Sequence, residues 1–139
     1  DRNNEKKRPY IIHRTSIGCY ERTLAMLIEK YAGAFPTWLS PVQVKVLPII
    51  DKQNEYAENV ANRLRSLGVR VEVDSRNEKI GYKIREAQLE KIPYMLVIGD
   101  KEMQNGQVAV RSRKEGDLGP MDLNRFAEMI TEEIATRAK

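Results

Sequence analysis

Residues Tyr94–Ile98 form a run that is apolar at every position. Successive side chains of a β-strand point to opposite faces of a sheet, so this run predicts a central strand that is buried on both faces. Such a strand requires a covering layer on each side of the sheet. The run therefore restricts the chain to a layered fold in which the sheet is covered on both faces.

The segments around this run alternate between strand-like and helix-like patterns. Three further runs of valines predict strands, and apolar residues at helical spacing predict three helices after Pro41. The order β-α-β-α-β-β-α is typical of a mostly parallel sheet, and Gln104–Gly106 reads as a turn that adds an antiparallel strand. The expected strands lie at 42–47, 69–73, 94–98 and around 108–110, and the expected helices begin after Asp51, at Ile80 and after the capping residue Asp122.

The first 40 residues look different from the rest. Tyr10–Ile12 has strand character, and Tyr20–Tyr31 carries one apolar stripe at helical spacing. Gly33 and Pro36 end that helix, and residues 35–41 read as a linker with aromatic anchors. We therefore expect two units, residues 1–40 and residues 41–139.

Composition excludes several classes of protein. The chain has 139 residues and a formal net charge of +4, which is too small an excess to indicate nucleic-acid binding by itself. No apolar run reaches the roughly 20 residues of a membrane span. One cysteine rules out an internal disulfide, one histidine cannot build a metal site alone, and the common catalytic motifs are absent. These observations favour a binding module over a catalyst.

Polar side chains follow two of the predicted parallel strands, at Asp74–Lys79 and Gly99–Glu102. Ligands of open α/β sheets bind at the carboxyl ends of strands. On the strand around Val108 and Val110, Arg111 faces the other side. Donors and acceptors together suit unstacked RNA bases, whereas ordinary surface salt bridges are the alternative. The residues that we single out are Asn77, Lys79, Lys101, Glu102 and Arg111.

Several longer motifs carry a resemblance to a known family. Ile17–Leu27 has the pattern Gly, apolar residues, Glu-Arg and an apolar helix, which is the form of motif three of class II aminoacyl-tRNA synthetases. From Tyr10 to the C-terminus the chain resembles threonyl-tRNA synthetases. The motifs that match are at Ile12–Arg14, Phe35–Gln43, Arg76–Glu86, Pro93–Glu102 and Val108–Arg113.

The resemblance implies a fold and a site. The fold would be a small α/β anticodon-binding domain with a five-stranded mixed sheet flanked by helices, preceded by a strand and a helix from the end of a class II catalytic domain. Arg22 would bind ATP and His13 would be a zinc ligand in the intact enzyme. The second and third anticodon bases of threonine tRNA would be read by Asn77, Lys79, Lys101, Glu102 and Arg111.

The resemblance also implies a larger protein. The intact enzyme would be a cytoplasmic, homodimeric ligase that attaches threonine to its tRNA with ATP, magnesium and zinc, without a membrane partner. We expect this chain to be its C-terminal piece, which binds the tRNA anticodon loop without a cofactor and without catalysis. The alternatives are a stand-alone, non-enzymatic tRNA-binding protein and the anticodon domain of a prolyl, glycyl or histidyl sister enzyme.

Overall fold

The computed structural model describes residues 2–16 and 18–138, so Ile17 of the predicted motif lies outside the described residues. The N-terminal segment is extended, and the prediction of a strand at Tyr10–Ile12 is wrong. Tyr10 is 101% exposed and Ile12 is 90% exposed, and neither residue belongs to the sheet. A strand needs a neighbour to pair with its backbone, and an apolar run alone does not supply one.

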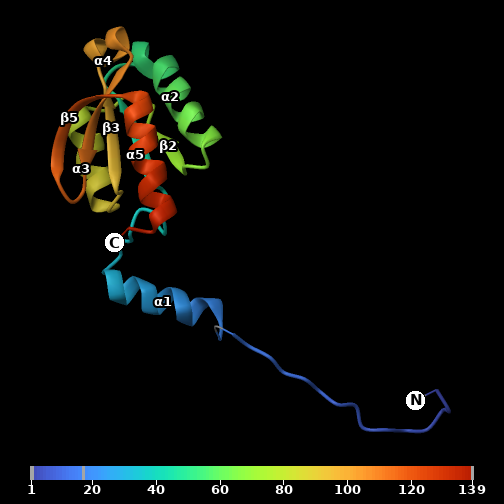
Figure 1. Cartoon of the computed structure of the whole chain (residues 1–139). Helices are drawn as coiled ribbons and strands as arrows, with labels where there is room; N and C mark the ends of the chain where they lie inside the picture. The colour runs from blue at the N-terminus through green and yellow to red at the C-terminus, as the bar shows by residue number, and fades with distance from the viewer. Residues whose placement is uncertain (1, 17, 139) are drawn as a thin grey trace.

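Helix α1 (Tyr20–Tyr31) forms where it was predicted, but none of its residues is buried. Tyr20, Leu24 and Ile28 of the apolar stripe are 79%, 54% and 47% exposed. The helix ends at Ala32 and Gly33, both in the left-handed conformation. Figure 1 shows α1 away from the sheet and its covering helices, so its stability depends on its own short backbone ladder.

The sheet has five strands in the order β2-β1-β3-β4-β5, which confirms the expected five-stranded mixed sheet. The pairs β1–β2 and β1–β3 are parallel, and the pairs β3–β4 and β4–β5 are antiparallel. The predicted central strand is therefore the middle strand, β3. The strands are β1 (Val44–Pro48), β2 (Val71–Val73), β3 (Tyr94–Ile98), β4 (Gln107–Ser112) and β5 (Gly116–Asp122).

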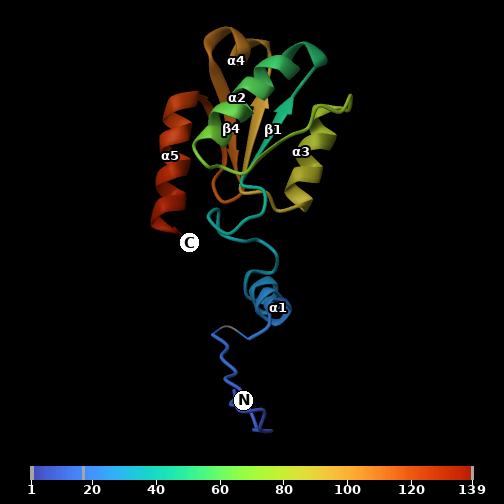
Figure 2. The same ribbon diagram turned by 90° about the vertical axis from the view of Figure 1, so that its right-hand side faces the viewer.

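Helices cover both faces of the sheet, as predicted (Figure 2). Helices α2 and α5 pack on one face around Leu64, Leu96 and Phe126, all fully buried. Helix α3 packs on the other face against Leu47 and Met95. The bounds are α2 (Asn54–Ser66), α3 (Ile80–Leu89) and α5 (Leu123–Thr136), with a 3-10 turn η1 (Asp51–Gln53) before α2.

Three local predictions need correction. The turn predicted at Gln104–Gly106 is the end of a short helix, α4 (Asp100–Asn105), and Gly106 is its left-handed cap with φ of 67°. Strand β5 was missed because Gly116, Gly119 and Pro120 are typical of loops. Asp51 makes no side-chain cap, and the side-chain amide oxygen of Gln53 instead accepts from the backbone N–H groups of residues 49 and 50.

The segment from Ala32 to Ser40, which we call the strap, is docked against the sheet domain through its backbone. Four side chains of the described residues donate to six of its carbonyl oxygens. This arrangement holds the strap by polar contacts at regular intervals. The donors are Lys91 to Ala32, Arg113 to Ala34 (3.3 Å) and Phe35 (2.6 Å), Gln43 to Thr37 (2.9 Å), and Arg70 to Trp38 and Ser40 (both 2.9 Å).

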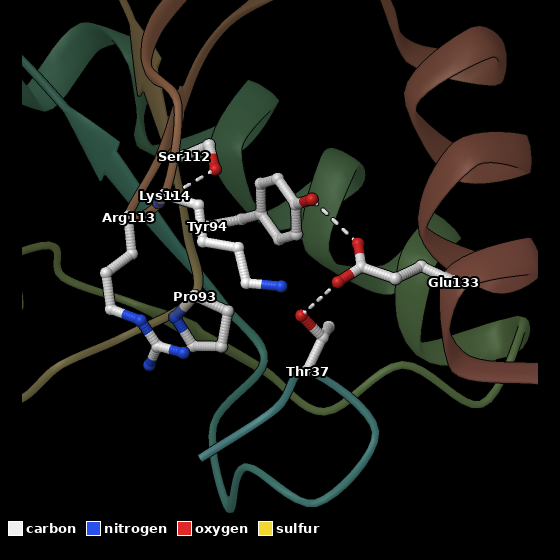
Figure 3. Close-up of a pocket in the computed structure, with 7 residues that line it drawn as sticks. All are labelled: Thr37, Pro93, Tyr94, Ser112, Arg113, Lys114 and Glu133. Carbon is white, nitrogen blue, oxygen red and sulfur yellow. Dashed lines mark hydrogen bonds between the residues drawn. The ribbon is translucent and has the colours of Figure 1, made fainter. Parts of the chain in front are cut away.

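A shared carboxylate adds a second attachment of the strap (Figure 3). The hydroxyls of Thr37 and Tyr94 donate to the two oxygens of Glu133 at 2.6 and 2.7 Å, which links the strap, β3 and α5. Burial and the bond to Glu133 raise the pKa of Tyr94 well above its usual range. The niche around them has about 10 Å³ of space, so its role is structural and not that of a ligand site.

The loop after β2 is fixed by a charged cluster. Asp74 is buried, and the guanidinium of Arg76 donates to its two oxygens at 2.8 and 2.6 Å and also to Glu86. The bond from Arg76 lowers the pKa of Asp74. The buried ammonium of Lys83 donates to the carbonyls of Pro48 (3.1 Å) and Asp74 (2.9 Å), which ties the ends of β1 and β2 together.

Helix α1 should exchange its amide hydrogens much faster than α5, which has a similar length but buries Phe126 and Ile130. An unpacked helix of 12 residues is marginal in water, whereas α5 opens only with the core. Hydrogen exchange measured by mass spectrometry on this chain checks the difference. Protection of α1 equal to that of β3 would contradict it.

Replacing Arg76 by leucine should lower the free energy of unfolding slightly at neutral pH, because the guanidinium is half exposed and water screens its pair with Asp74. The pKa of Asp74 is lower in the folded protein than in the unfolded chain. The pair with Arg76 therefore stabilises the fold at pH values above the unfolded pKa of Asp74. This stabilisation is lost as the pH falls through the folded pKa. Urea unfolding from pH 7 down to about pH 3 should show the difference shrinking. A difference that stays constant with pH would refute the pairing. The control is Arg63→Leu, which replaces an exposed residue of α2.

Candidate nucleic-acid interface

Parallel pairing places the carboxyl ends of β2, β1 and β3 at one edge of the sheet. The loop after β2 carries Asn77 and Lys79, and α4 after β3 carries Lys101 and Glu102. Figure 2 shows this loop and α4 at the same end of the domain. The structure therefore brings four of the five predicted site residues to a common edge, where the first three are exposed and Glu102 is half-buried.

The loop that carries Asn77 and Lys79 is held at both ends. At its start, Asp74 is fixed by the side chain of Arg76 and its carbonyl accepts from Lys83. At its end, Lys79 is the residue before α3, and its carbonyl accepts from the backbone N–H groups of Tyr82 (2.8 Å) and Lys83 (3.2 Å). The two side chains thus project from a short, anchored segment, which reduces the entropy lost when they bind a ligand.

The position of α4 depends on a contact that Glu102 makes itself. Its carboxylate accepts from the backbone N–H of Gly99 at 2.9 Å, and Gln53 donates to Asp100 at 3.0 Å. A Cβ at Gly99 would lie 2.9 Å from the Glu102 carboxylate and 3.1 Å from Ile49, so a larger residue there would displace the ends of these two side chains. Glu102 therefore has a helix-capping role beside any role in recognition.

Arg111 lies away from the edge, on the face of the sheet that α3 also occupies. It pairs in register with Met95, three residues before the end of β3, which corresponds to roughly 10 Å along the strand. Val108 and Val110 are buried on the other face, which confirms the predicted orientation of Arg111. On the Arg111 side Ala109 is half-buried and Pro120 is exposed, so this face of β4 and β5 is open to a ligand.

Asp117 is a residue that the sequence did not single out. It lies opposite Arg111 across the β4–β5 pair, and its carboxylate accepts from the Arg111 guanidinium at 3.0 Å. The register of the two strands shifts between Val110 and Arg111, so the residue opposite Arg111 cannot be found by counting along the sequence. The only available signal was an aspartate between glycines six residues after an arginine on a strand.

We group the five predicted residues and the open sheet face as one candidate surface, which we call the interface. It offers four cationic or amide donors, and it has acceptors at Asn77 and Glu102. A surface that bound only phosphate would carry donors alone. The mixture is suited to the edges of unstacked bases, and the half-buried sheet face beside it can receive their planes.

A neighbouring hollow of about 300 Å³ is lined by residues of β1, β2, the loop after β2 and α3. Five of the six charged groups in its lining are already paired with one another. It therefore has little to offer a charged ligand, and we do not include it in the interface. The paired groups are Lys45 with Glu90 (2.6 Å) and Arg76 with Asp74 and Glu86.

The structure does not bring His13 or Arg22 to the interface. His13 is exposed on the extended N-terminal segment, and Arg22 is exposed on α1, at the opposite end of the molecule from α4 (Figure 1). Among the described residues, no group of three or more His, Cys, Asp or Glu side chains converges on a metal position. Zinc usually takes four ligands, so these residues do not fit a zinc site by themselves.

No helix in the described ranges has the length and apolar character needed to cross a membrane.

Comparison with known proteins identifies similar domains and relatives. The anticodon binding domain family matches residues 43–133. A threonine–tRNA ligase of Clostridium botulinum is 69% identical over 139 residues, which is 100% of this chain and 22% of that protein. The chain thus spans about a fifth of the length of the curated relatives that it matches.

Two solved structures share the fold. The RNA binding domain of threonyl-tRNA synthetase from Cryptosporidium parvum superposes with a TM-score of 0.76 at 36% identity, over 81% of this chain and 28% of that one. A prolyl-tRNA synthetase from the same organism has a TM-score of 0.65 at 24% identity, over 73% of this chain and 23% of that one. The family match covers the sheet and most of α5, and on this evidence the chain belongs to the anticodon-binding domain family.

Proposed function

We propose that this chain reads the anticodon of threonine tRNA as part of a threonyl-tRNA synthetase. The observation that carries the proposal is the mixture of donors and acceptors on the interface, held by anchored segments beside an open sheet face. The matched relatives that are 59–69% identical are threonine–tRNA ligases, which supports threonine as the amino acid. In that setting the whole protein would be a homodimeric, ATP-dependent ligase of the cytoplasm.

The residues of the interface have distinct roles in this proposal. The side-chain amide of Asn77 can donate and accept at one base edge, and Glu102 accepts from a base amino or imino group. Lys79 and Lys101 supply charge for the backbone or for a base oxygen. Arg111 presents a planar fork to two acceptors, and it lies far enough from α4 to contact a different base.

Two further residues belong to the proposal for the whole protein. Arg22 would bind ATP, because a guanidinium stays charged and offers a rigid fork to phosphate. His13 would supply one imidazole to a zinc ion whose other ligands come from outside this chain. Zinc with an open coordination position would hold the amino and hydroxyl groups of threonine.

The sister enzymes remain a second candidate because the fold is shared with a prolyl-tRNA synthetase at 24% identity. The identity to a threonine–tRNA ligase of Clostridium botulinum is 69%, and the match covers the whole chain. A stand-alone tRNA-binding protein is the third candidate. Binding to stem-loops that carry threonine, proline, glycine and histidine anticodons separates the threonyl enzyme from its sister enzymes, because only the threonyl enzyme is expected to prefer the threonine anticodon.

Replacing Arg111 by alanine should weaken binding to a threonine anticodon stem-loop about ten- to hundredfold, corresponding to about 1–3 kcal/mol for a charged contact to a base edge. The core should be unaffected, because Arg111 faces away from Val108 and Val110. Fluorescence anisotropy with stem-loops varied at the second and third anticodon positions measures the effect. The loss should be confined to loops with the correct base at one position.

The matched control is Arg63→Ala, which removes an exposed cation from α2, a helix on the opposite face of the sheet. It should leave binding to every stem-loop nearly unchanged. If Arg111→Ala weakens all loops alike and lowers the salt dependence, Arg111 contacts phosphate and its base-reading role is wrong. If the unmodified chain binds all anticodons equally, the proposed function fails.

A further inference from the structure

The contact between Arg111 and Asp117 has a geometry that bears on recognition. Nη2 of Arg111 and Oδ2 of Asp117 are 3.0 Å apart. The second oxygen of Asp117 accepts from the backbone N–H of Gly119 at 2.9 Å. The carboxylate is thus fixed by the β4–β5 hairpin itself, and the guanidinium is held against a fixed point.

This ion pair is too exposed to matter greatly for folding. The side chain of Arg111 is 39% exposed and that of Asp117 is 55% exposed. Ion pairs at such positions contribute little to the free energy of unfolding because water and salt screen them. The contact can have a larger effect on ligand binding by Arg111, because Asp117 sets the orientation of the guanidinium and offsets part of its charge.

An arginine on an RNA-binding surface faces two kinds of acceptor. A lone guanidinium attracts every phosphate of a single strand, and such contacts carry no sequence information. A carboxylate 3.0 Å away offsets the positive charge and repels phosphate. A neutral base edge is not repelled, and a guanidinium has five N–H donors, so donors beyond the one facing Asp117 are available for two acceptors of a base.

We propose that Asp117 is a positioning residue that makes Arg111 read a base edge and not a phosphate. The inference rests on the proposed function, because it assigns a partner to a residue of the same interface. Asp117 orients the guanidinium through the fixed carboxylate and lowers its attraction for the RNA backbone. The preferred ligand is a base with two acceptors on one edge, such as the O6 and N7 of guanine.

The test is Asp117→Asn, which keeps the size of the side chain and the oxygen that accepts from Gly119 but removes the charge. Binding to stem-loops with the threonine anticodon and with second- and third-position changes is measured from low to moderate salt. We expect discrimination at one position to fall about tenfold, mainly through tighter binding of the wrong loops, and the salt slope to steepen by about 0.7, as for one added phosphate contact on a single strand. Asp117→Glu, which restores the charge, should recover part of the discrimination.

The matched control is Glu115→Gln, which removes the same charge from an exposed position two residues earlier in the hairpin. It should leave discrimination unchanged. If both variants change discrimination and salt slope equally, or if Asp117→Asn alters neither, Asp117 has no positioning role although the anticodon is still read. If the unmodified chain shows no anticodon preference, the proposed function fails first. Thermal melts of each variant confirm that the hairpin is intact.

Discussion

The structure depends on strand β3, which is hydrogen-bonded on both edges and lies between helices on both faces. Its parallel pairing with β1 places α4 at the same edge as the loop after β2. Its antiparallel pairing with β4 returns the chain along the sheet, away from that edge. The two modes of pairing therefore give the interface its shape, with four residues along an edge and Arg111 on the sheet face below them.

Much of this framework could be predicted from the sequence. The apolar run at Tyr94–Ile98 predicted the central strand, and Asp122 caps α5 through bonds to the backbone N–H groups of residues 124 and 125. The candidate positions came from the ends of the predicted strands, whereas their proposed base-reading role came from the resemblance of whole motifs, since single charged residues on a loop carry little information. The residues alone also supplied the side of β4 on which Arg111 lies, because strand alternation is a strict geometric rule.

The remainder depends on contacts between segments that are distant in sequence. A glycine in the left-handed conformation ends α4 at Gly106 and would equally have formed a tight turn, so the pattern around it fits both structures. Strand β5 exists because β4 pairs with it, in spite of residues that disfavour strands. Tyr10–Ile12 shows the reverse, since a good strand pattern without a neighbour forms no strand. Asp117 could not be identified because the register shift in β4 decides which residue it meets.

The strap has a consequence for the permitted length of the chain between α1 and β1. Connecting segments usually accept insertions and deletions readily, because their backbone is solvated. Here six carbonyls between Ala32 and Ser40 meet donors whose positions are set by α3, β4 and the segments that flank β1 and β2. One residue more or less would move several carbonyls away from their donors at once. The length of the strap is thus fixed by the positions of these donors, and it determines where the chain of α1 joins the sheet domain.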